Sequence, residues 1–274
     1  MVRLFSCRKR HCRCVSRQIL AFPGLDGEQI RRPRPASLAP VFLRFVEGQD
    51  VTECKSMRTY GWVATELCFK DVEIVNERML RSPFKIIGVP RLLDGFPSVK
   101  PMQVRGVDDE IVYLTEIRVR EPSLGLPIVE SLIDLPFIMV LACSDLKKSI
   151  AWVKDVWGLP VSDPVEVKND IISNFFETNP EEKHELCIVK GEGQTFLELD
   201  QFPVGATVRP QYSGILPPGV AITSMMFPDF ERLRGHWAVP AVICEGAIYG
   251  GRRVGMLLTP DGALLEVVEG SPDK

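Results

Sequence analysis

The sequence contains few histidines, only three in 274 residues. His11 lies in a basic leader, whereas His184 precedes a strand-like run and His236 ends a helix-like run, so we expect surface or loop positions for both. A mononuclear iron site is commonly built from two histidines and one carboxylate. Such a site is therefore not expected in this chain.

Long apolar runs and a strong net charge are also missing. The longest clean apolar run covers residues 136–143, far short of the roughly 20 residues needed to cross a bilayer. The net charge of -3 and the pI near 5.8 provide no overall attraction to nucleic acid or to an anionic membrane. The chain also lacks a P-loop and a Gly-x-Ser-x-Gly elbow. We therefore expect a small-molecule partner, with no nucleic acid and no membrane.

The eight cysteines form no framework that would indicate disulfides or zinc. The pair Cys12 and Cys14 lacks the Cys-x2-Cys spacing of a zinc site. Reduced cysteine behaves as a small hydrophobe inside apolar strands, and four stand singly in such runs: Cys68, Cys143, Cys187 and Cys244. This usage favours a reducing compartment, and we expect a cytoplasmic protein.

The start of the chain differs from the rest in charge. The first twenty residues carry six Lys or Arg and no acid. No apolar segment of the kind found in secretory signals follows, so secretion is not expected. A transit peptide and a nucleic-acid-binding arm stay open as alternatives. We favour a basic leader or degenerate first module over residues 1–38.

Three segments share one order of elements: an apolar strand, an aspartate and an amphipathic helix. The aspartates are Asp71, Asp145 and Asp229, at intervals of 74 and 84 residues. Each aspartate is placed to cap its helix, and Gly158 is placed to end the second one. Two or three strand-like runs follow each helix. The sequence therefore predicts an α+β fold built from repeated βαβββ modules.

A fourth, leading module is expected to be incomplete. Residues 40–48 have the pattern of its last strand, but its first strand and helix are not recognisable in the leader. Residues 121–134 contain two prolines and a glycine and indicate a link. We predict an N-terminal domain over residues 39–125 and a C-terminal domain over residues 130–274.

Two carboxylates lie within apolar strand-like runs. Glu266 stands among Leu and Val residues, and Glu198 stands between two leucines. A buried carboxylate is costly unless it is paired, protonated or bound. Three interpretations stay open: a divalent metal site, an ion pair with Arg252 or Arg253, and proton transfer by acids with a raised pKa.

Two stretches carry a family resemblance. Residues 145–160 and residues 259–266 resemble the opening helix and the closing strand of the vicinal oxygen chelate superfamily, which includes glyoxalase I, extradiol dioxygenases and bleomycin-resistance proteins. The match covers residues 135–270, and residues 60–118 match more weakly. The resemblance implies paired modules that curl into open, cup-shaped sheets.

The resemblance also implies where a metal would bind. The ligand positions on the last strands match Glu198 and Glu266, which implies one divalent ion (Mn, Fe, Zn, Ni or Mg) if a metal is used at all. The first-strand positions match Ile138 and Ile222, which cannot bind a metal. An extradiol dioxygenase of the usual form is therefore not expected.

Other candidate site residues follow from the same alignment. In the N-terminal pair of modules the ligand positions match Ala64 and Tyr113. Glu66 lies two residues from Ala64 and should share its face. We predict Glu66 and Glu266 as catalytic acids or bases, and the substrate-binding candidates are Gln103, Tyr113 and Trp152. For Tyr113 and Trp152, ordinary packing stays open as the alternative.

Two functions remain. The first is an enzyme that abstracts a proton from an oxygenated or aromatic metabolite, as isomerases and lyases do. The second is a metal-free protein that sequesters a small molecule, as bleomycin-resistance relatives do. A homodimer stays open in either case. The retained carboxylates favour the enzyme.

Overall fold

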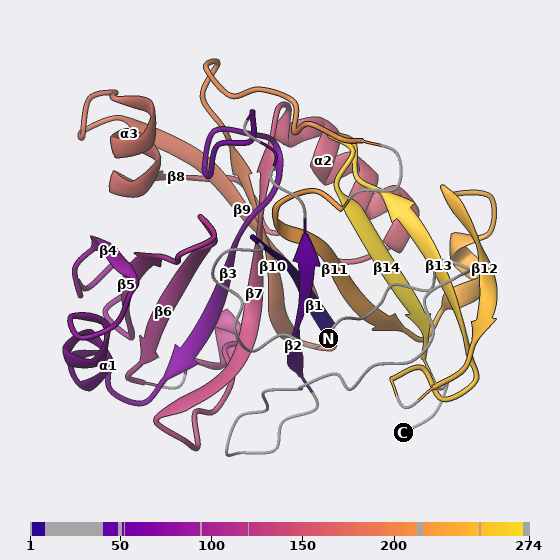
Figure 1. Ribbon diagram of the computed structural model, residues 1–274, viewed down its shortest axis with the longest axis horizontal. Helices are drawn as coiled ribbons and strands as arrows, with labels where there is room; N and C mark the ends of the chain where they lie inside the picture. The colour runs from indigo at the N-terminus through magenta and orange to yellow at the C-terminus, as the bar shows by residue number, and fades with distance from the viewer. Residues whose placement is uncertain are drawn as a thin grey trace.

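The computed structural model describes residues 2–8, 41–48, 51, 53–93, 95–119, 121–212, 216–246 and 248–270. Its strands form one eight-stranded and one six-stranded sheet, which stand beside each other and curl (Figure 1). Helices are few and short. Within the described ranges no helix is long and apolar enough to cross a membrane.

The eight-stranded sheet consists of two βαβββ modules. The first contains β3 (Gly61–Phe69), α1 (Val72–Met79), β4 (Lys85–Gly88), β5 (Val99–Arg105) and β6 (Ile111–Ile117). The second contains β7 (Ile133–Cys143), α2 (Leu146–Trp152), β8 (Val165–Lys168), β9 (Lys183–Gly191) and β10 (Gln194–Gln201). Their first strands, β3 and β7, pair antiparallel at the centre of the sheet.

The six-stranded sheet combines a third module with the start of the chain. The module supplies β11 (Gly219–Phe227), β12 (Val239–Cys244), β13 (Arg252–Leu258) and β14 (Leu264–Glu269), and the leading strands are β1 (Val2–Arg8) and β2 (Phe42–Gly48). Strand β1 pairs antiparallel with β11, and β2 runs parallel to β1. The predicted last strand of a leading module is therefore confirmed. The expectation that its first strand is missing is wrong, because β1 occupies that place.

This pairing groups the modules differently from the sequence prediction. The pairing of β3 with β7 crosses the boundary between residues 39–125 and 130–274, and β2 joins the other sheet. The link itself contains a short 3-10 turn, η1 (Pro122–Leu124). The two ranges stay a prediction about units of folding, which hydrogen-bonded pairing between strands does not define.

The predicted caps begin and end two helices. Asp71 accepts hydrogen bonds from the backbone N–H groups of Glu73 and Ile74, and Asp145 accepts one from Lys148. The second helix continues into a π-helical turn, η2 (Val153–Trp157), and ends at Gly158 with a φ of 65°. An L-residue rarely adopts that angle, so glycine suits this position.

Two helical segments differ from the sequence prediction. After Asp229 only a 3-10 turn forms, η3 (Phe230–Leu233), and the Asp229 side chain makes no capping hydrogen bond. Gly235 follows with a φ of 90°, which takes the chain out of helical geometry. A further helix, α3 (Asp170–Phe176), was not expected. Its N-cap is Asn169, whose side chain accepts from Ile171 and Ile172.

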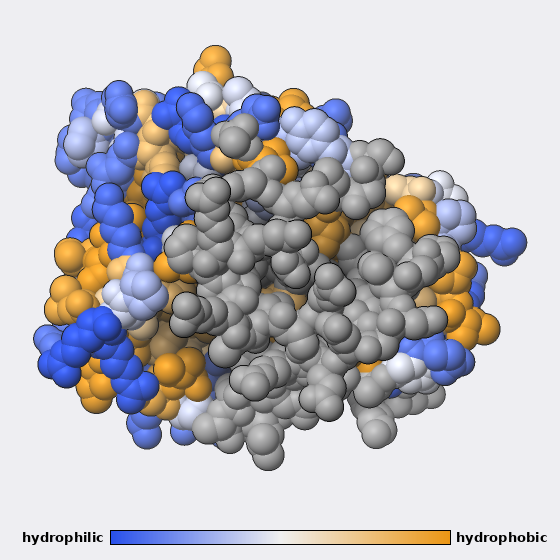
Figure 2. All heavy atoms as spheres, viewed as in Figure 1, coloured by the Kyte–Doolittle hydropathy of each residue, from blue (hydrophilic) through white to orange (hydrophobic). Residues whose placement is uncertain are grey.

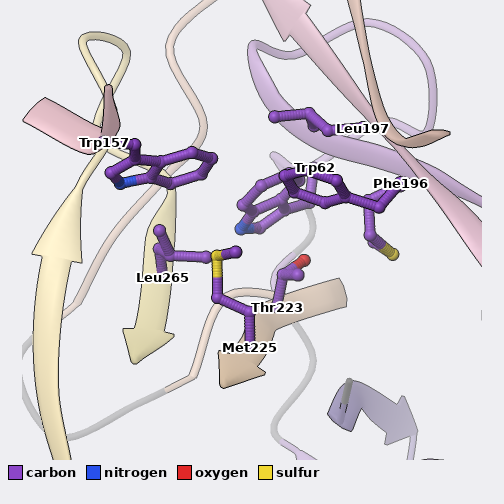
Figure 3. Close-up of a pocket in the computed structure, with 8 residues that line it drawn as sticks. Trp62, Trp157, Phe196, Leu197, Thr223, Met225 and Leu265 are labelled. Atoms are coloured by element: carbon purple, nitrogen blue, oxygen red, sulfur yellow. The ribbon is translucent and has the colours of Figure 1, made fainter. Parts of the chain in front are cut away.

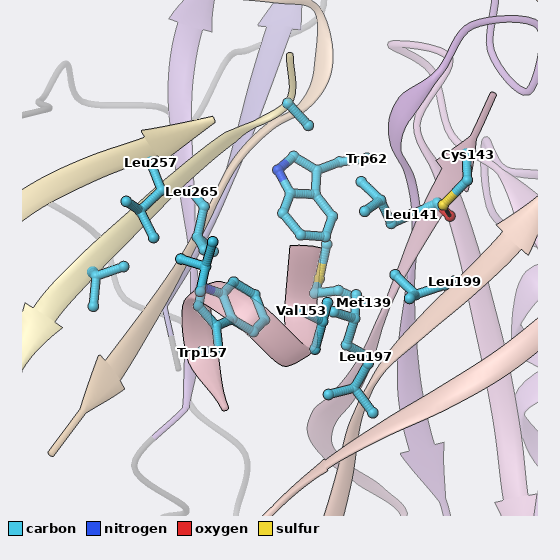
Figure 4. Close-up of a cluster of buried hydrophobic side chains, with 14 of the residues drawn as sticks. Trp62, Met139, Leu141, Cys143, Val153, Trp157, Leu197, Leu199, Leu257 and Leu265 are labelled. Atoms are coloured by element: carbon cyan, nitrogen blue, oxygen red, sulfur yellow. Dashed lines mark hydrogen bonds between the residues drawn. The ribbon is translucent and has the colours of Figure 1, made fainter. Parts of the chain in front are cut away.

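The main core lies between the two sheets. Helix α2 and η2 cover one side of it, and the sheets contribute large apolar side chains that face each other (Figure 4). Its largest buried members include Trp62, Met139, Leu141, Leu197 and Leu199. Apolar surface also appears at the right margin of Figure 2, over β12, where Val239, Val242 and Ile243 are exposed. The main core packs against one face of each sheet. The opposite face of the eight-stranded sheet carries a second apolar cluster, which includes Ile138 and Val140.

Candidate active site

Strand alternation brings several acids to one face of the eight-stranded sheet. On β10, Leu197 and Leu199 face the core beside α2, so Glu198 and Asp200 face the opposite way. We call this opposite face, on β3, β5, β6, β7 and β10, the first cup. The corresponding face of the six-stranded sheet is the second cup. Polar side chains are rare in such apolar surroundings, which makes the acids of the first cup candidates for function.

Glu198 and Asp200 form a carboxyl pair. Asp200 is 1% exposed and Glu198 is half-buried. Burial raises the pKa of Asp200 to about 7, the interaction with the Glu198 carboxyl lowers it in part, and the nearby charge of Glu66 raises it further. Burial and the neighbouring Asp200 hold the pKa of Glu198 well above its usual range. Neither oxygen of Asp200 has a donor among the described residues. Two carboxyl groups in this setting are best satisfied when they share one proton.

Tyr113 lies next to this pair. It stands on β6, opposite Glu66 on β3 and Gln103 on β5. Its hydroxyl is buried and makes no hydrogen bond of good geometry within the described part of the chain, although the Asn169 side chain lies near enough to lower its pKa in part. Burial raises the pKa of Tyr113 well above its usual value, followed by the charges of Asp200 and Glu198. The phenol therefore stays protonated and can donate a hydrogen bond.

Glu66 occupies the centre of the sheet. It pairs in register with Ile138 on β7, and the Thr115 hydroxyl donates a hydrogen bond to its Oε1. Only 7% of Glu66 is exposed. The predicted candidates Glu66, Gln103 and Tyr113 thus stand in adjacent strands, and Glu198 completes the group.

Helix α3 covers part of the first cup. Ile171 and Ile172 pack into the apolar cluster that contains Ile138, and Phe176 meets the ring of Phe202 edge-on at 5.8 Å. Helix α3 therefore separates part of the cup from solvent.

His184 belongs to this covered region, contrary to the expected surface or loop position. It is a buried residue of β9, and its Nε2 lies 3.4 Å from the Ser173 hydroxyl of α3. Burial lowers the pKa of His184, which favours the neutral ring. His236, in contrast, is exposed as expected.

The second cup contains a closed hydrogen-bond network. Glu266 is 1% exposed and accepts from the Ser224 hydroxyl at 2.6 Å and from the Tyr249 hydroxyl at 2.9 Å. The Tyr249 hydroxyl in turn accepts from both Nη atoms of Arg44, each at 3.3 Å. Arg44 is fully buried. A buried cation and a buried carboxylate thus compensate each other through a phenol.

Arg253, one of the two arginines considered as an ion-pair partner of Glu266, binds other acids. Arg253 forms ion pairs with Glu269 at 2.7 Å and with Glu231 at 2.6 Å. Glu269 lies three residues beyond Glu266 on β14, on the other face of the strand. The interpretation that Arg253 neutralises Glu266 is therefore wrong.

Comparison with known proteins identifies the fold. No protein-family model and no curated protein matches the sequence. Two solved variants of glyoxalase I from Zea mays align with a TM-score of 0.53, at 17% and 19% identity, over 84% of this chain and 74% and 73% of theirs. A putative dioxygenase from Bacillus subtilis aligns with a TM-score of 0.49 at 10% identity, over 84% of this chain and 67% of that chain.

The chain has the vicinal oxygen chelate fold. The predicted α+β architecture of repeated βαβββ modules in paired open sheets is confirmed. Identities this low show the fold alone. What the chain does must be argued from its own residues.

Within the vicinal oxygen chelate fold, the two predicted metal ligands do not meet. Glu198 lies in the eight-stranded sheet and Glu266 in the six-stranded sheet. The reason is the choice of partner strands, since β7 pairs with β3 and β11 pairs with β1. This pairing of strands therefore gives no support to a single ion held by both carboxylates, which stays a prediction. Glu66 and Glu266, each predicted as a catalytic acid or base, are divided between the sheets in the same way.

Trp152 also lies away from the acids. It stands on α2, packs against the main core and meets Trp157 edge-on with ring centroids 5.0 Å apart. The first cup is on the opposite face of the sheet. A role in binding a substrate beside Glu198 is therefore not supported for Trp152, because α2 turns its apolar face to the core.

The residues present do not fit a metal ion. The first-strand positions Ala64, Ile138 and Ile222 are buried and carry no donor atom. Across the described ranges, His, Cys, Asp and Glu nowhere gather in a group of three that could hold a metal. In the second cup Glu266 shares its network with the cation Arg44. A divalent ion beside a buried guanidinium would meet strong repulsion.

A small hollow between the sheets is a weaker candidate. Apolar and aromatic side chains line it (Figure 3): Trp62, Met139, Trp157, Phe196, Leu197, Met225 and Leu265, together with Thr223. None of these side chains is an acid or base that could move a proton near neutral pH. The hollow belongs to the packing between the sheets, whereas the buried acids Glu66, Glu198 and Asp200 lie in the first cup.

Four residues of these networks were not predicted as site residues: Asp200, Arg44, Tyr249 and Ser224. Asp200 could have been found, because it follows Glu198 by two positions in one strand and must share its face. Arg44 could also have been found, because it interrupts an apolar run as Glu266 does. Ser224 and Tyr249 carry no comparable signal, because hydroxyl side chains are common in strands and turns.

Proposed function

We propose that this chain is a small-molecule enzyme that transfers a proton with the carboxyl pair of the first cup and without a metal. The observation that carries the proposal is the Glu198–Asp200 pair, buried beside the unpartnered hydroxyl of Tyr113. Groups whose pKa lies near neutral pH are suited to general acid–base work. The vicinal oxygen chelate fold of the chain accommodates such a cup.

The chemistry that suits the pair is isomerisation through an enol. With one proton shared, one carboxyl group is a base and the other is an acid. The base takes a proton from the hydroxyl-bearing carbon next to a carbonyl, and the carbonyl oxygen gains a proton to give an enediol. The pair then returns a proton to the former carbonyl carbon as the other hydroxyl loses its own, so the protons balance and no electron acceptor is needed. In this proposal the Tyr113 hydroxyl donates a hydrogen bond to the oxygen that becomes negative.

A second candidate is a binding protein that encloses a small molecule without turnover. The observation that favours it is the cover over the cup, where Ile171 and Ile172 of α3 are buried. A covered cup suits retention of a ligand. The two candidates differ in whether carbon-bound hydrogen exchanges with water.

Hydrogen exchange into ²H₂O, followed by NMR, tests the proposal. A panel of 2-hydroxy ketones and 2-oxo acids is incubated with the parent protein and with two variants. Asp200→Asn removes the shared proton, and Glu185→Gln is the matched control on an exposed site of β9. We expect exchange with the parent and the control and at least a hundredfold loss with Asp200→Asn. Exchange that is equal in all three proteins, or absent from every compound, would reject the proposal.

A further inference from the structure

The two cups are equivalent by register. In the first, Glu66 of β3 pairs with Ile138, and Val140 pairs with Glu198. In the second, the position of Leu4 in β1 pairs with Ile222, and Ser224 pairs with Glu266. Glu198 and Glu266 therefore occupy the same place in two copies of one arrangement.

The remaining last strands complete this equivalence. Tyr113 pairs in parallel register with Glu66, and Arg44 pairs with the position of Leu4. Tyr113 in the first cup thus corresponds to Arg44 in the second. Each cup thus has an acid on one last strand and another polar residue on the other, and the first cup adds Glu66 where the second has the position of Leu4.

In the second cup the negative charge of the buried acid is compensated by a buried cation of the chain. There the guanidinium of Arg44 donates to the Tyr249 hydroxyl, which donates to Glu266. A planar cation with several N–H donors, a phenol and a carboxylate form one buried network. The chain itself provides this cation.

The first cup has the phenol and the acids of such a network. Asp200 adds a second acid beside Glu198, where the second cup has Val268. Both oxygens of Asp200 and the Tyr113 hydroxyl lack partners among the residues that the structure describes, and each of the two side chains is more than nine-tenths buried. The cup therefore offers acceptors without matching donors.

We infer that the first cup binds a small organic cation of the guanidinium or amidinium class, in the role that Arg44 has in the second cup. The inference rests on the proposed function, because it names the class of substrate for the same site. A planar cation with paired N–H donors can bridge two carboxylate oxygens and a phenol. A metal ion would need more ligands than Ala64 and Ile138 allow.

Glu198 is the partly exposed member of the carboxyl pair, since it is half-buried whereas Asp200 is buried. Helix α3 bounds the cup on another side and is held by the ion pair of Arg91 with Asp170 at 2.8 Å, which is largely exposed. An exposed pair contributes little stability, so the buried side chains of Ile171 and Ile172 do most to hold α3 in place.

Calorimetric titration with three matched probes tests the inference. Methylguanidine is a planar cation with N–H donors, methylurea is its neutral counterpart, and tetramethylammonium is a cation without donors. Each is titrated into the parent, Asp200→Asn, Glu198→Gln and the control Glu185→Gln at pH 8. Circular dichroism verifies that each variant is folded.

We expect methylguanidine to bind the parent at least tenfold more tightly than either other probe. Asp200→Asn and Glu198→Gln should each weaken this binding at least tenfold, and Glu185→Gln should leave it unchanged. Equal binding of methylguanidine and methylurea, no binding of methylguanidine, or binding that survives both acid variants would overturn the inference.

Failure of this inference and failure of the proposed function give different results. If neutral carbonyl compounds exchange hydrogen but methylguanidine does not bind, the proposed function stands and the cation class is wrong. If methylguanidine binds but no compound exchanges hydrogen, the cup is a cation-binding site and the enzyme proposal fails.

Discussion

Asp200 and Glu198 stand two positions apart on β10 and face the same cup, and burial raises the pKa of both carboxyl groups. No described residue donates to Asp200. Burial is the main cause of the raised pKa of Asp200. The alternation of side chains along β10 places Glu198 on the same face. This arrangement costs stability at neutral pH, which is the usual mark of a group kept for function.

The first prediction concerns stability and pH. The pKa of Asp200 is raised in the folded state to about 7 from 3.8, so its contribution to stability is complete below pH 4 and is lost as the pH rises through 7. The variant Asp200→Asn has no carboxyl group to ionise at this position, so its stability does not fall in this way as the pH rises. We expect the variant to be about 4 kcal/mol more stable than the parent at pH 8. The difference should vanish near pH 4. Urea unfolding at both pH values measures it, and a difference that grows toward low pH would contradict the account.

The second prediction concerns Tyr113. Its hydroxyl is buried without a partner among the described residues, and such a group costs about 1–3 kcal/mol. Tyr113→Phe should therefore raise the free energy of unfolding by about 1 kcal/mol. The same change should lower hydrogen exchange on substrate at least tenfold, because the donor to the enol oxygen is gone. A variant that loses both stability and exchange would indicate a packing role instead.

The third prediction concerns the second cup. Arg44 and Glu266 meet through Tyr249, so removing one charge leaves the other buried and uncompensated. We expect Arg44→Gln and Glu266→Gln each to cost about 3 kcal/mol. The double variant should cost much less than their sum, with a coupling of about 2 kcal/mol. Additive costs in urea unfolding would show that the two residues act separately.

The fourth prediction concerns the cover of the first cup. Asn169 caps α3 by accepting from Ile171 and Ile172 at 3.1 and 3.2 Å. Asn169→Ala should destabilise the protein by about 1 kcal/mol, and Asn169→Asp should retain the cap. We also expect the alanine variant to release bound methylguanidine faster, because the first turn of α3 frays more often without its cap. Stopped-flow displacement compares the two variants, and equal release rates would argue against α3 as the cover.

The sequence was sufficient to predict the modules because their signals are local. An apolar strand, an aspartate cap and a helix period recur at Asp71 and Asp145, and the hydrogen bonds of both caps are present. The third helix failed to form because the chain leaves helical geometry at Gly235, after one 3-10 turn. Helix α3 was missed because its seven residues are too few to show a clear period.

The pairing of modules could not be predicted in the same way. The contact of β3 with β7 joins strands about 70 residues apart along the chain, and β1 reaches β11 across most of the chain. Local pattern carries no information on such partners. Glu198 and Glu266 were therefore recognised individually as unusual, but the sequence did not show that they lie in different sheets. Glu66, Gln103 and Tyr113 were brought together because they depend only on pairing within one module.

The central claim is that Glu198 and Asp200 share a proton near neutral pH. Infrared difference spectroscopy of the parent against Asp200→Asn, in ¹H₂O and ²H₂O at pH 6, measures it directly. The account predicts a protonated carboxyl band in the parent that shifts in ²H₂O and is changed or lost in the variant, while Glu185→Gln leaves it intact. A parent protein without any protonated carboxyl band at pH 6 would contradict the claim and the acid–base function built on it.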